Sequence, residues 1–321
     1  MPQVSTPHVF LGSAYAALSF AAFSTHDALI KTLAGYPVFQ IIFFAVLFSL
    51  IPVILYLMLD RRERSLRCKV PHLMAVRCLG ILGSTLGAFY AFSVLPLAQV
   101  YALIFSAPVI ITLLAIPFLG ERVHLIRWLA ILLGLAGVLV VLQPGRSPLS
   151  VGHLAGFGAA VSLAASSIST RMIGNREHNA TLVIYPMMTM LLACGVATIW
   201  LYKPLSGEAL AILFAIGSLN VLGQALLVLA YRASEAQFVA PVQYTQILWA
   251  IFFGTVFFGE QISLHVLAGS AIIILSGLLF VWRELTAPGN KPVLRTRNLR
   301  GAAGPATPPL PAENPGQEHR P

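Results

Sequence analysis

The sequence predicts an all-α polytopic membrane protein with ten transmembrane helices, arranged as two inverted five-helix repeats. The first observation is composition: 58% of the 321 residues are hydrophobic and 10% are charged, against about 25% charged in soluble domains. The second is a set of long uncharged stretches, of which 78–120 is about twice the roughly 20 residues that span a bilayer. The third is a pattern shared by the two halves of the chain. In lipid, such stretches favour helices, because a helix satisfies its own backbone polar groups.

Ten hydrophobic segments are expected to cross the membrane. Pro96, in the sequence VLPLA, splits the long 78–120 stretch into two helices, because proline favours a turn there. The proline-rich residues 286–321 cannot form a packed core, and they are predicted to be a disordered cytoplasmic tail. The expected helices are 10–32, 38–59, 72–93, 97–118, 124–143, 152–172, 181–202, 209–231, 236–258 and 264–284.

The distribution of basic residues orients these helices. If the N-terminus is cytoplasmic, 17 of the 20 Lys and Arg residues fall in cytoplasmic segments, in agreement with the positive-inside rule. Because the number of helices is even, both termini are then cytoplasmic, in the cell inner membrane. This topology and the attraction of anionic lipid account for the net charge of +9, so no nucleic-acid partner is needed.

The two halves of the chain match each other in two places. Helix 10–32 contains LGSAYAALSFAAFS and helix 152–172 contains LAGFGAAVSLAASS, which align at an offset of 143. A second match places Gly120–Glu121 opposite Gly259–Glu260. Chance would explain the first match alone, but two matches in the same order favour duplication. Five helices are an odd number, so the second copy enters the membrane from the opposite side. The predicted divisions are 1–145, 146–285 and the tail 286–321.

Two longer segments carry a resemblance to a known family. They are LPLAQVYALIFSAPVIITLLAIPFLGERVHLIRWLAILLGLAGVLVVLQPG and AYRASEAQFVAPVQYTQILWAIFFGTVFFGEQISLHVLAGSAIIILSGLLFVW. With the ten spans, they resemble the EamA-type repeats of the drug/metabolite transporter superfamily over about residues 8–285. The resemblance implies an inner-membrane carrier of small metabolites, whose helices 1, 3, 4, 6, 8 and 9 line a cavity while helices 5 and 10 act as scaffold. Similar sequences often carry an arginine in helix 2, where this chain has the uncharged PVFQIIFFAVLF.

One polar segment, STHDALIK, interrupts helix 10–32 and contains His26, Asp27 and Lys31. Asp27 and Lys31 are four residues apart and share a helix face, so one interpretation is an intrahelical ion pair. The other is that Asp27, with His26 beside it, faces the cavity and binds a cationic group or a proton. Ionisable residues at membrane depth tend to be functional because they are costly to bury. We expect a cavity-facing carboxylate that Lys31 neutralises.

Further polar and aromatic residues lie on the helices that are expected to line the cavity. The structural alternatives are hydrogen bonding between helices and, for tyrosines near span ends, anchoring at the membrane interface. Aromatic rings with a few amides suit a planar or zwitterionic metabolite better than a bare ion. Pro108 and Pro241 are hinge candidates, because proline removes a backbone donor and kinks a helix. The candidate substrate-binding residues, beside His26 and Asp27, are Tyr90, Tyr101, Ser106, Asn220, Gln224, Tyr244, Gln246 and Trp249.

These observations favour a secondary transporter that moves a small polar metabolite by alternating access. The family resemblance offers amino-acid-like compounds and their derivatives, S-adenosylmethionine and riboflavin-like vitamins as candidates. One alternative is a membrane-embedded lipid or prenyl transferase, but the loop carboxylates are too scattered to hold magnesium. The other is a passive channel, against which the inverted duplication argues.

The sequence predicts no enzyme activity, catalytic residue, cofactor or metal site. It contains no Walker motif, and Cys68, Cys78 and Cys194 fall in no metal or redox spacing. The expected partners are a small-molecule substrate and the lipid bilayer, and a homodimer is left open.

Overall fold

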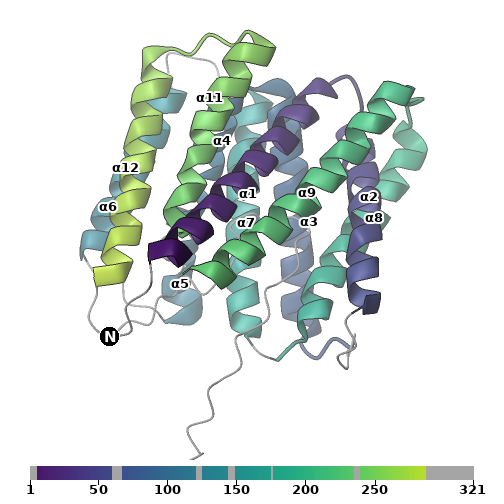
Figure 1. The fold of residues 1–321 in the computed structure, drawn as a ribbon, viewed down its shortest axis with the longest axis horizontal. Helices are drawn as coiled ribbons and strands as arrows, with labels where there is room; N and C mark the ends of the chain where they lie inside the picture. The colour runs from purple at the N-terminus through teal and green to yellow at the C-terminus, as the bar shows by residue number, and fades with distance from the viewer. Residues whose placement is uncertain are drawn as a thin grey trace, which may run out of the picture.

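The computed structural model describes residues 6–59, 67–120, 125–143, 149–174, 176–234 and 239–286. The regular secondary structure within these segments is helical (Figure 1). The first half contributes α1 (Thr6–Thr32), α2 (Val38–Leu59), α3 (Pro71–Val94), α4 (Leu97–Ile104), α5 (Ala107–Leu119) and α6 (Leu125–Leu142). The second contributes α7 (Val151–Ile173), α8 (Asn179–Leu201), α9 (Gly207–Ala233), the 3₁₀ helix η1 (Ala240–Tyr244), α11 (Thr245–Phe258) and α12 (Leu264–Thr286).

These helices make ten membrane spans, because α4 with α5 and η1 with α11 each form one broken span. Six spans in the described part of the chain are long and apolar enough to cross a membrane, and α2, α6 and α12 contribute shorter apolar segments. The remaining span, α1, is 27 residues long but carries the polar segment around Asp27. The predicted all-α, ten-span architecture is confirmed.

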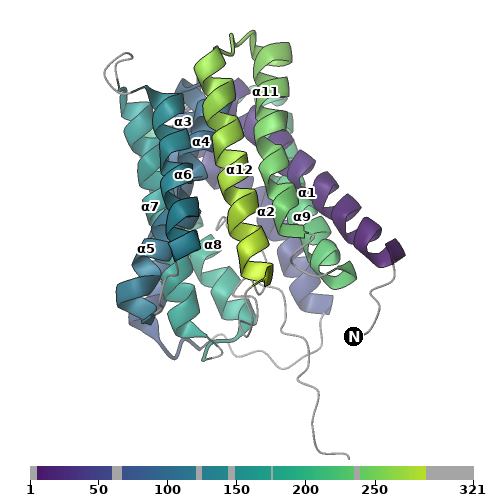
Figure 2. The ribbon, with the colours of Figure 1, turned by 90° about the vertical axis from the view of Figure 1, so that its left-hand side faces the viewer.

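The packing of the helices repeats when the two halves are exchanged. α1 packs on α9, and its counterpart α7 packs on α3; likewise α2 packs on α9, and α8 on α3. Two pairs, α2 with α8 and α6 with α12, join equivalent helices directly, and they lie at opposite sides of the molecule in Figure 1. Figure 2 shows α6 and α12 side by side from a second direction. This exchange symmetry is the arrangement of two inverted five-helix repeats.

Small residues allow the repeats to approach closely. A Cβ atom on Gly80 of α3 would come within 2.8 Å of the Ser162 carbonyl oxygen of α7. At the α6–α12 contact, a Cβ on Gly269 would lie 2.7 Å from the Gly137 carbonyl oxygen. Such contacts stabilise membrane helix pairs, because lipid supplies little hydrophobic drive between helices and packing must do so.

The glycine of the Gly-Glu motif, which precedes the last helix of each repeat, has the same local structure in both halves. Gly120 and Gly259 end α5 and α11 with left-handed backbones, at φ 65° and 60° respectively. Glycine adopts this conformation without a steric penalty, which makes it a common helix terminator. Glu260 lies within the described residues, whereas its counterpart Glu121 does not.

Two predicted spans differ from the structure in being interrupted. The segment 97–118 was expected as one helix but contains a break at Phe105–Ser106, and 236–258 divides into η1 and α11. In both, a proline close to the break lacks the N–H that a continuous helix needs. The predicted tail 286–321 lies outside the described residues, apart from Thr286 at the end of α12.

Candidate functional site

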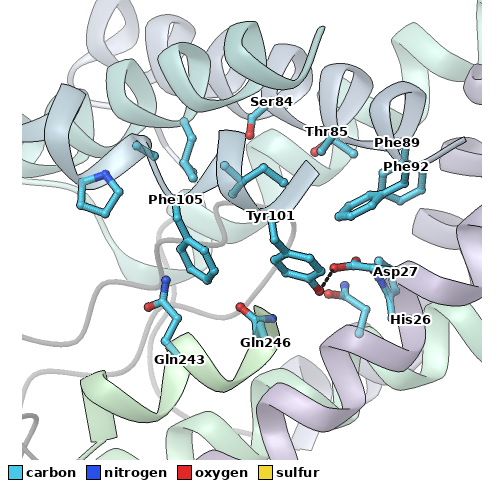
Figure 3. A pocket seen from close by; sticks show the side chains of 16 residues that line it. His26, Asp27, Ser84, Thr85, Phe89, Phe92, Tyr101, Phe105, Gln243 and Gln246 are labelled. Carbon is cyan, nitrogen blue, oxygen red and sulfur yellow. Dashed lines mark hydrogen bonds and ion pairs between the residues drawn. The ribbon is translucent and has the colours of Figure 1, made fainter. Parts of the chain in front are cut away.

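A cavity lies between the two repeats, and both contribute side chains to it (Figure 3). Its walls come from α1, α3 and the α4–α5 span of the first half, and from α7, α9 and the η1–α11 span of the second. These are the six spans that the family resemblance implies. The cavity volume is about 80 Å³, several times the roughly 10–15 Å³ that one buried water needs. Its polar lining consists of His26, Asp27, Ser84, Thr85, Tyr101, Asn220, Gln243 and Gln246.

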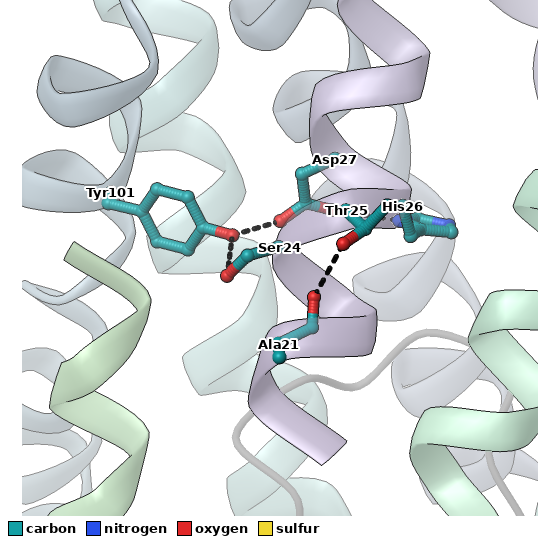
Figure 4. A network of polar contacts seen from close by, with 6 residues as sticks. All are labelled: Ala21, Ser24, Thr25, His26, Asp27 and Tyr101. Carbon is teal, nitrogen blue, oxygen red and sulfur yellow. Dashed lines mark hydrogen bonds and ion pairs between the residues drawn. The ribbon is translucent and has the colours of Figure 1, made fainter. Parts of the chain in front are cut away.

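Asp27 is the one acidic side chain among the described residues that line this cavity. It is 1% exposed. The Tyr101 hydroxyl donates to its Oδ2 atom at 2.5 Å, and His26 Nδ1 lies 2.8 Å from its Oδ1 atom (Figure 4). Tyr101 also reaches the Ser24 hydroxyl at 3.3 Å. A tyrosine hydroxyl stabilises the carboxylate without cancelling its charge, because the donor is neutral.

The helical periodicity of α1 explains why Asp27 points inward. Phe20, Phe23, Ser24, Asp27 and Ile30 are all buried, and their spacing of three and four residues places them on one face of the helix. This face packs against α9 and meets α11 and α3. The carboxylate is therefore held by the same stripe that fixes the helix in the bundle.

The ion pair expected between Asp27 and Lys31 is replaced by contacts across the bundle. Lys31 Nζ lies 2.6 Å from Glu260 Oε1 and donates to the Leu95 carbonyl oxygen at 2.6 Å. Glu260 in turn accepts a hydrogen bond from the Leu97 N–H at 3.1 Å. The long lysine side chain reaches linkers that pack beside the end of α1, an option that helix spacing does not reveal. The prediction that Lys31 neutralises Asp27 is therefore wrong.

Aromatic side chains form one wall of the cavity. The Phe89 ring packs edge-on against His26, with 5.9 Å between ring centroids. Phe92 lies 5.7 Å from Tyr101, and Tyr101 lies 6.0 Å from Phe105. This chain of rings places π-faces and polarised edges around the carboxylate, which is a suitable environment for a cation or a planar group.

Two half-helices begin beside the cavity. α5 starts at Ala107 with Pro108 in its first turn, and α11 starts at Thr245, directly after η1. The lining includes Ala107 and Pro108 from the first, and Gln246 from the first turn of the second. The backbone runs on from the preceding turn at both starts: the Ser106 N–H donates to the Leu103 carbonyl, and the Thr245 N–H donates to the Gln243 and Val242 carbonyls.

Gln246 has an unusual hydrogen-bonding state. Its side chain lines the cavity and the residue is 3% exposed. Its Nε2 atom is buried and makes no hydrogen bond within the described part of the protein. Since a buried donor without an acceptor is costly, a ligand that supplies an acceptor here would gain affinity.

The structure brings together about half of the predicted site residues. His26, Asp27, Tyr101, Asn220 and Gln246 line the cavity, and so does the hinge candidate Pro108. The other hinge candidate, Pro241, lies in the first turn of η1. Both prolines thus stand next to the breaks in their spans.

The remaining candidates lie outside the lining. Tyr90 is 37% exposed on α3, and Ser106 is buried with its hydroxyl donating to the Leu103 carbonyl. The Tyr244 ring packs on the ring of the lining residue Phe105, with 5.3 Å between the ring centroids. Trp249 stacks on Phe253, and Gln224 is buried on α9.

Sequence reasoning missed the residues that α3 contributes. Ser84, Thr85, Phe89 and Phe92 line the cavity, and Phe105 joins them from the α4–α5 break. A usable signal was the segment GSTLGAF, where two hydroxyls sit between glycines in an otherwise apolar helix. Polar residues among small ones mark helix faces that pack against other helices.

The fold and the cavity together define a class of protein. Two inverted repeats around a central site, with broken helices beside that site, are the architecture of secondary transporters. The chain belongs to the EamA-like transporter family, whose model matches residues 10–143 and 150–282. Each match covers one five-helix repeat. No group of three or more potential metal ligands occurs among the residues that the structure describes.

Related proteins with assigned names are metabolite transporters. The chain is 27% identical over 271 residues to the pseudopaline exporter of Pseudomonas aeruginosa, covering 83% of this chain and 94% of that one. It is 26% identical over 279 residues to the S-adenosylmethionine uptake transporter of Rickettsia conorii, covering 85% and 93%. It is 30% identical over 198 residues to the riboflavin transporter of Rhizobium johnstonii, covering 61% and 65%. A crystal structure with TM-score 0.58 and 18% identity covers 86% of this chain and 98% of its own, and shows a likeness of fold.

Proposed function

We propose that this protein is an inner-membrane secondary transporter that carries a small polar metabolite by alternating access, with both termini in the cytoplasm. The observation that supports this most directly is the buried cavity between two inverted repeats, which contains a carboxylate, amides and aromatic rings. The family membership and the named relatives support transport of small molecules. Their named cargoes differ, so amino-acid derivatives, S-adenosylmethionine and riboflavin-like vitamins all stand as candidates.

The candidate residues divide into binding and moving parts. Asp27, Tyr101, Asn220 and Gln246 would contact the substrate. Pro108 and Pro241 would mark the points about which the broken spans bend. The contact of Lys31 with Glu260 and Leu95 joins α1, the α11–α12 linker and the α3–α4 linker. It would hold one end of the cavity closed and separate when that end opens.

A carrier and a channel differ in one measurable property. A carrier that alternates between two states supports counterflow, in which labelled substrate accumulates against a preloaded unlabelled pool. Proteoliposomes containing the purified full chain would be preloaded with S-adenosylmethionine, riboflavin or mixed L-amino acids, and then diluted into the labelled compound. We expect transient accumulation of at least one compound without ATP. Equilibration without overshoot would indicate a channel, and chemical conversion of a compound would indicate an enzyme.

The orientation has its own test. A reporter that is active only in the periplasm should be inactive when fused after Thr286 and active when inserted in the 144–148 linker. Activity at both points would contradict the even-span topology. An insertion in the 235–238 linker, on the predicted cytoplasmic side, should be inactive and serves as the matched control.

A further inference from the structure

The two broken spans have the same local structure at the break, one in each repeat. Phe105 and Tyr244 are equivalent at the offset of 139 that aligns the two Gly-Glu motifs, and both have a helical backbone, at φ −71° and −68°. The residue that follows carries a hydroxyl in each span, Ser106 in one and Thr245 in the other. Each hydroxyl donates to the carbonyl three residues before it, at 2.6 and 2.7 Å. The repeat therefore places one aromatic ring at each break.

These two rings contact each other but have different surroundings. Their centroids are 5.3 Å apart. Phe105 lines the cavity, and Figure 3 shows its ring beside that of Tyr101, at 6.0 Å between centroids. Tyr244 is outside the cavity lining, at the end of η1, which packs against α12. Tyr244 therefore contacts the cavity wall without itself lining the cavity.

The Tyr244 ring also lies against Gly277 of α12. A Cβ atom at position 277 would come within 3.0 Å of the Cε1, Cζ and Oη atoms of Tyr244, which real Cβ atoms essentially never do. These three are the nearest atoms that such a Cβ would meet. Glycine is unfavourable in the middle of a helix, so the space that the tyrosine ring needs explains its presence here. Gly277 is the seat of the Tyr244 ring.

We infer that Tyr244, seated on Gly277, is a positioning residue that holds Phe105 in place and thereby sets the width of the cavity. This inference rests on the proposed transport function, because the width of the cavity limits the size of the substrate. In a close-packed interior one ring cannot move alone. A side chain at position 277 displaces Tyr244, and the contact with Phe105 passes this displacement to the cavity wall. Since the cavity volume is about 80 Å³, a shift of one ring changes which compounds fit.

A direct contact between Tyr244 and the substrate makes a different prediction. Such a contact would use the hydroxyl group, whereas positioning of Phe105 uses the volume of the ring. Tyr244→Phe removes the hydroxyl and keeps the ring. Under the positioning role it should transport compounds of every size as the wild type does.

The test measures size selectivity in proteoliposomes that contain the full chain. The probes are single L-amino acids from glycine to tryptophan, S-adenosylmethionine and riboflavin. KM and kcat are measured for the smallest and the largest compound that the wild type transports. Gly277→Ala should raise the KM of the largest compound about tenfold or more and change that of the smallest less than about twofold, because a narrower cavity rejects size and not chemistry. The readout is the ratio of the two KM values.

Two further variants assign this effect to the Tyr244 ring. Tyr244→Leu alone removes support from Phe105 and should shift the KM ratio in the opposite direction, in favour of the larger compound. It tests the inference even where Gly277→Ala does not fold. The double variant should lie closer to the wild type than either single variant, because the smaller side chain leaves room for the added methyl group.

Gly269→Ala is the matched control. It is the same substitution on the same helix, but its Cβ would lie 2.7 Å from the Gly137 carbonyl oxygen of α6 and does not meet Tyr244. It should lower the thermal midpoint without changing the KM ratio.

A second measurement reports the width of the cavity without a substrate. Ser84 lines the cavity from α3. A Ser84→Cys variant that lacks the three native cysteines is labelled with methyl or benzyl methanethiosulfonate. Adding Gly277→Ala should slow the benzyl reagent more than the methyl reagent, and adding Gly269→Ala should leave the ratio of the two rates unchanged.

The outcomes separate this inference from the transport function. An equal change in KM for small and large compounds in Gly277→Ala, or the same change in Gly269→Ala, would overturn the positioning role. Loss of transport in Tyr244→Phe would also overturn it, because the hydroxyl would then act on the substrate directly. Absence of counterflow with every compound would contradict the transport function, and the ratio of labelling rates would then decide the positioning role by itself.

Discussion

The helices α1 and α7 occupy equivalent places in the two repeats but carry different chemistry. At the offset of 143 that aligns them, Ser24 corresponds to Ser167, Asp27 to Thr170 and Lys31 to Gly174. Asp27 lines the cavity, whereas Thr170 accepts a hydrogen bond from Arg77 of α3 and donates to the Ser166 carbonyl. The helix packing is therefore symmetric, while the carboxylate that lines the cavity belongs to the first copy.

This difference separates the features that alternating access would require in both repeats from those that it would require in one repeat. Two similar half-structures allow the bundle to rearrange in two mirrored ways around the same site. The proposed substrate contact, in contrast, needs one carboxylate that stays at the central cavity in both states. The second repeat has the hydroxyl residues Ser169 and Thr170 where the first has His26 and Asp27, which avoids a second buried charge at this place.

The two ends of the bundle show a related contrast. Gln40, at the start of α2, donates to the Lys203 carbonyl at 2.8 Å and accepts from the Lys203 N–H at 2.9 Å. Glu177, just before α8, accepts from the Lys69 and Val70 N–H groups at 2.5 and 2.6 Å. Each contact joins the start of the second span of one repeat to the linker before the third span of the other. Among the described residues, the Lys31–Glu260 pair adds a further contact at the α1 end.

The largest expected effect comes from making α1 like α7. Asp27→Thr should reduce the transport rate about 100-fold, because the cavity loses the acidic side chain that we propose contacts the substrate. The measurement is initial uptake into proteoliposomes at matched protein incorporation. Thr25→Val is the control on the same helix, since the Thr25 hydroxyl donates to the Ala21 carbonyl and the residue does not line the cavity, and we expect it to retain most of the rate.

The reciprocal exchange sharpens this test. Asp27→Thr combined with Thr170→Asp moves the carboxylate to the equivalent place in the second repeat. There it would meet Arg77 instead of the cavity, so transport should stay as low as in Asp27→Thr alone. Recovery of transport would show that the two repeats are interchangeable in function as well as in backbone.

Much of the fold could be predicted from the sequence, because each span is a long apolar run with at most two charged residues and the repeat appears in residues such as Gly120 and Gly259. The site was harder to predict for a physical reason. In a membrane helix, apolar residues face lipid and protein alike, so Phe89 and Phe92 carry no mark that assigns them to a cavity. Polar residues are unusual in an apolar helix, and this signal identified Asp27, Tyr101 and Gln246 as candidates. The partner of Lys31 depends on how two linkers pack, which no local spacing reports.

The next largest expected effect concerns the Lys31–Glu260 contact at the end of α1. Lys31→Met should lower the free energy of unfolding by roughly 3 kcal/mol, because Glu260 would remain as a buried unpaired charge; the two side chains are 17% and 10% exposed. The double substitution Lys31→Met with Glu260→Gln should cost clearly less. Unfolding in detergent of the wild type, both single variants and the double variant gives the coupling energy. Additive losses would mean that the two residues do not stabilise each other.

A smaller effect compares the contacts that both ends share. Glu177→Ala removes the acceptor of the buried Val70 N–H and the part-buried Lys69 N–H and should cost about 2 kcal/mol of unfolding free energy. Gln40→Ala removes the amide nitrogen that donates to the Lys203 carbonyl and the amide oxygen that accepts from the Lys203 N–H. It should cost a similar amount of unfolding free energy. Equal losses, measured by unfolding in detergent, would support equivalent roles in the two repeats. A loss confined to one variant would show that only that end depends on its contact.

The smallest effect is chemical and concerns Cys68, in the linker before α3. Burial raises the pKa of its thiol, a hydrogen bond from the Val70 backbone partly offsets this, and the hydrogen bond to Glu177 and the negative charge of that residue raise the pKa further. Maleimide reacts with the thiolate, so labelling of Cys68 should become faster only at a pH above the range of an ordinary thiol. Glu177→Gln removes the neighbouring charge and should move the labelling profile toward lower pH. Cys78 and Cys194 are buried within α3 and α8, so a Cys68→Ser variant measures their background. An unchanged profile in Glu177→Gln would show that burial alone controls this thiol.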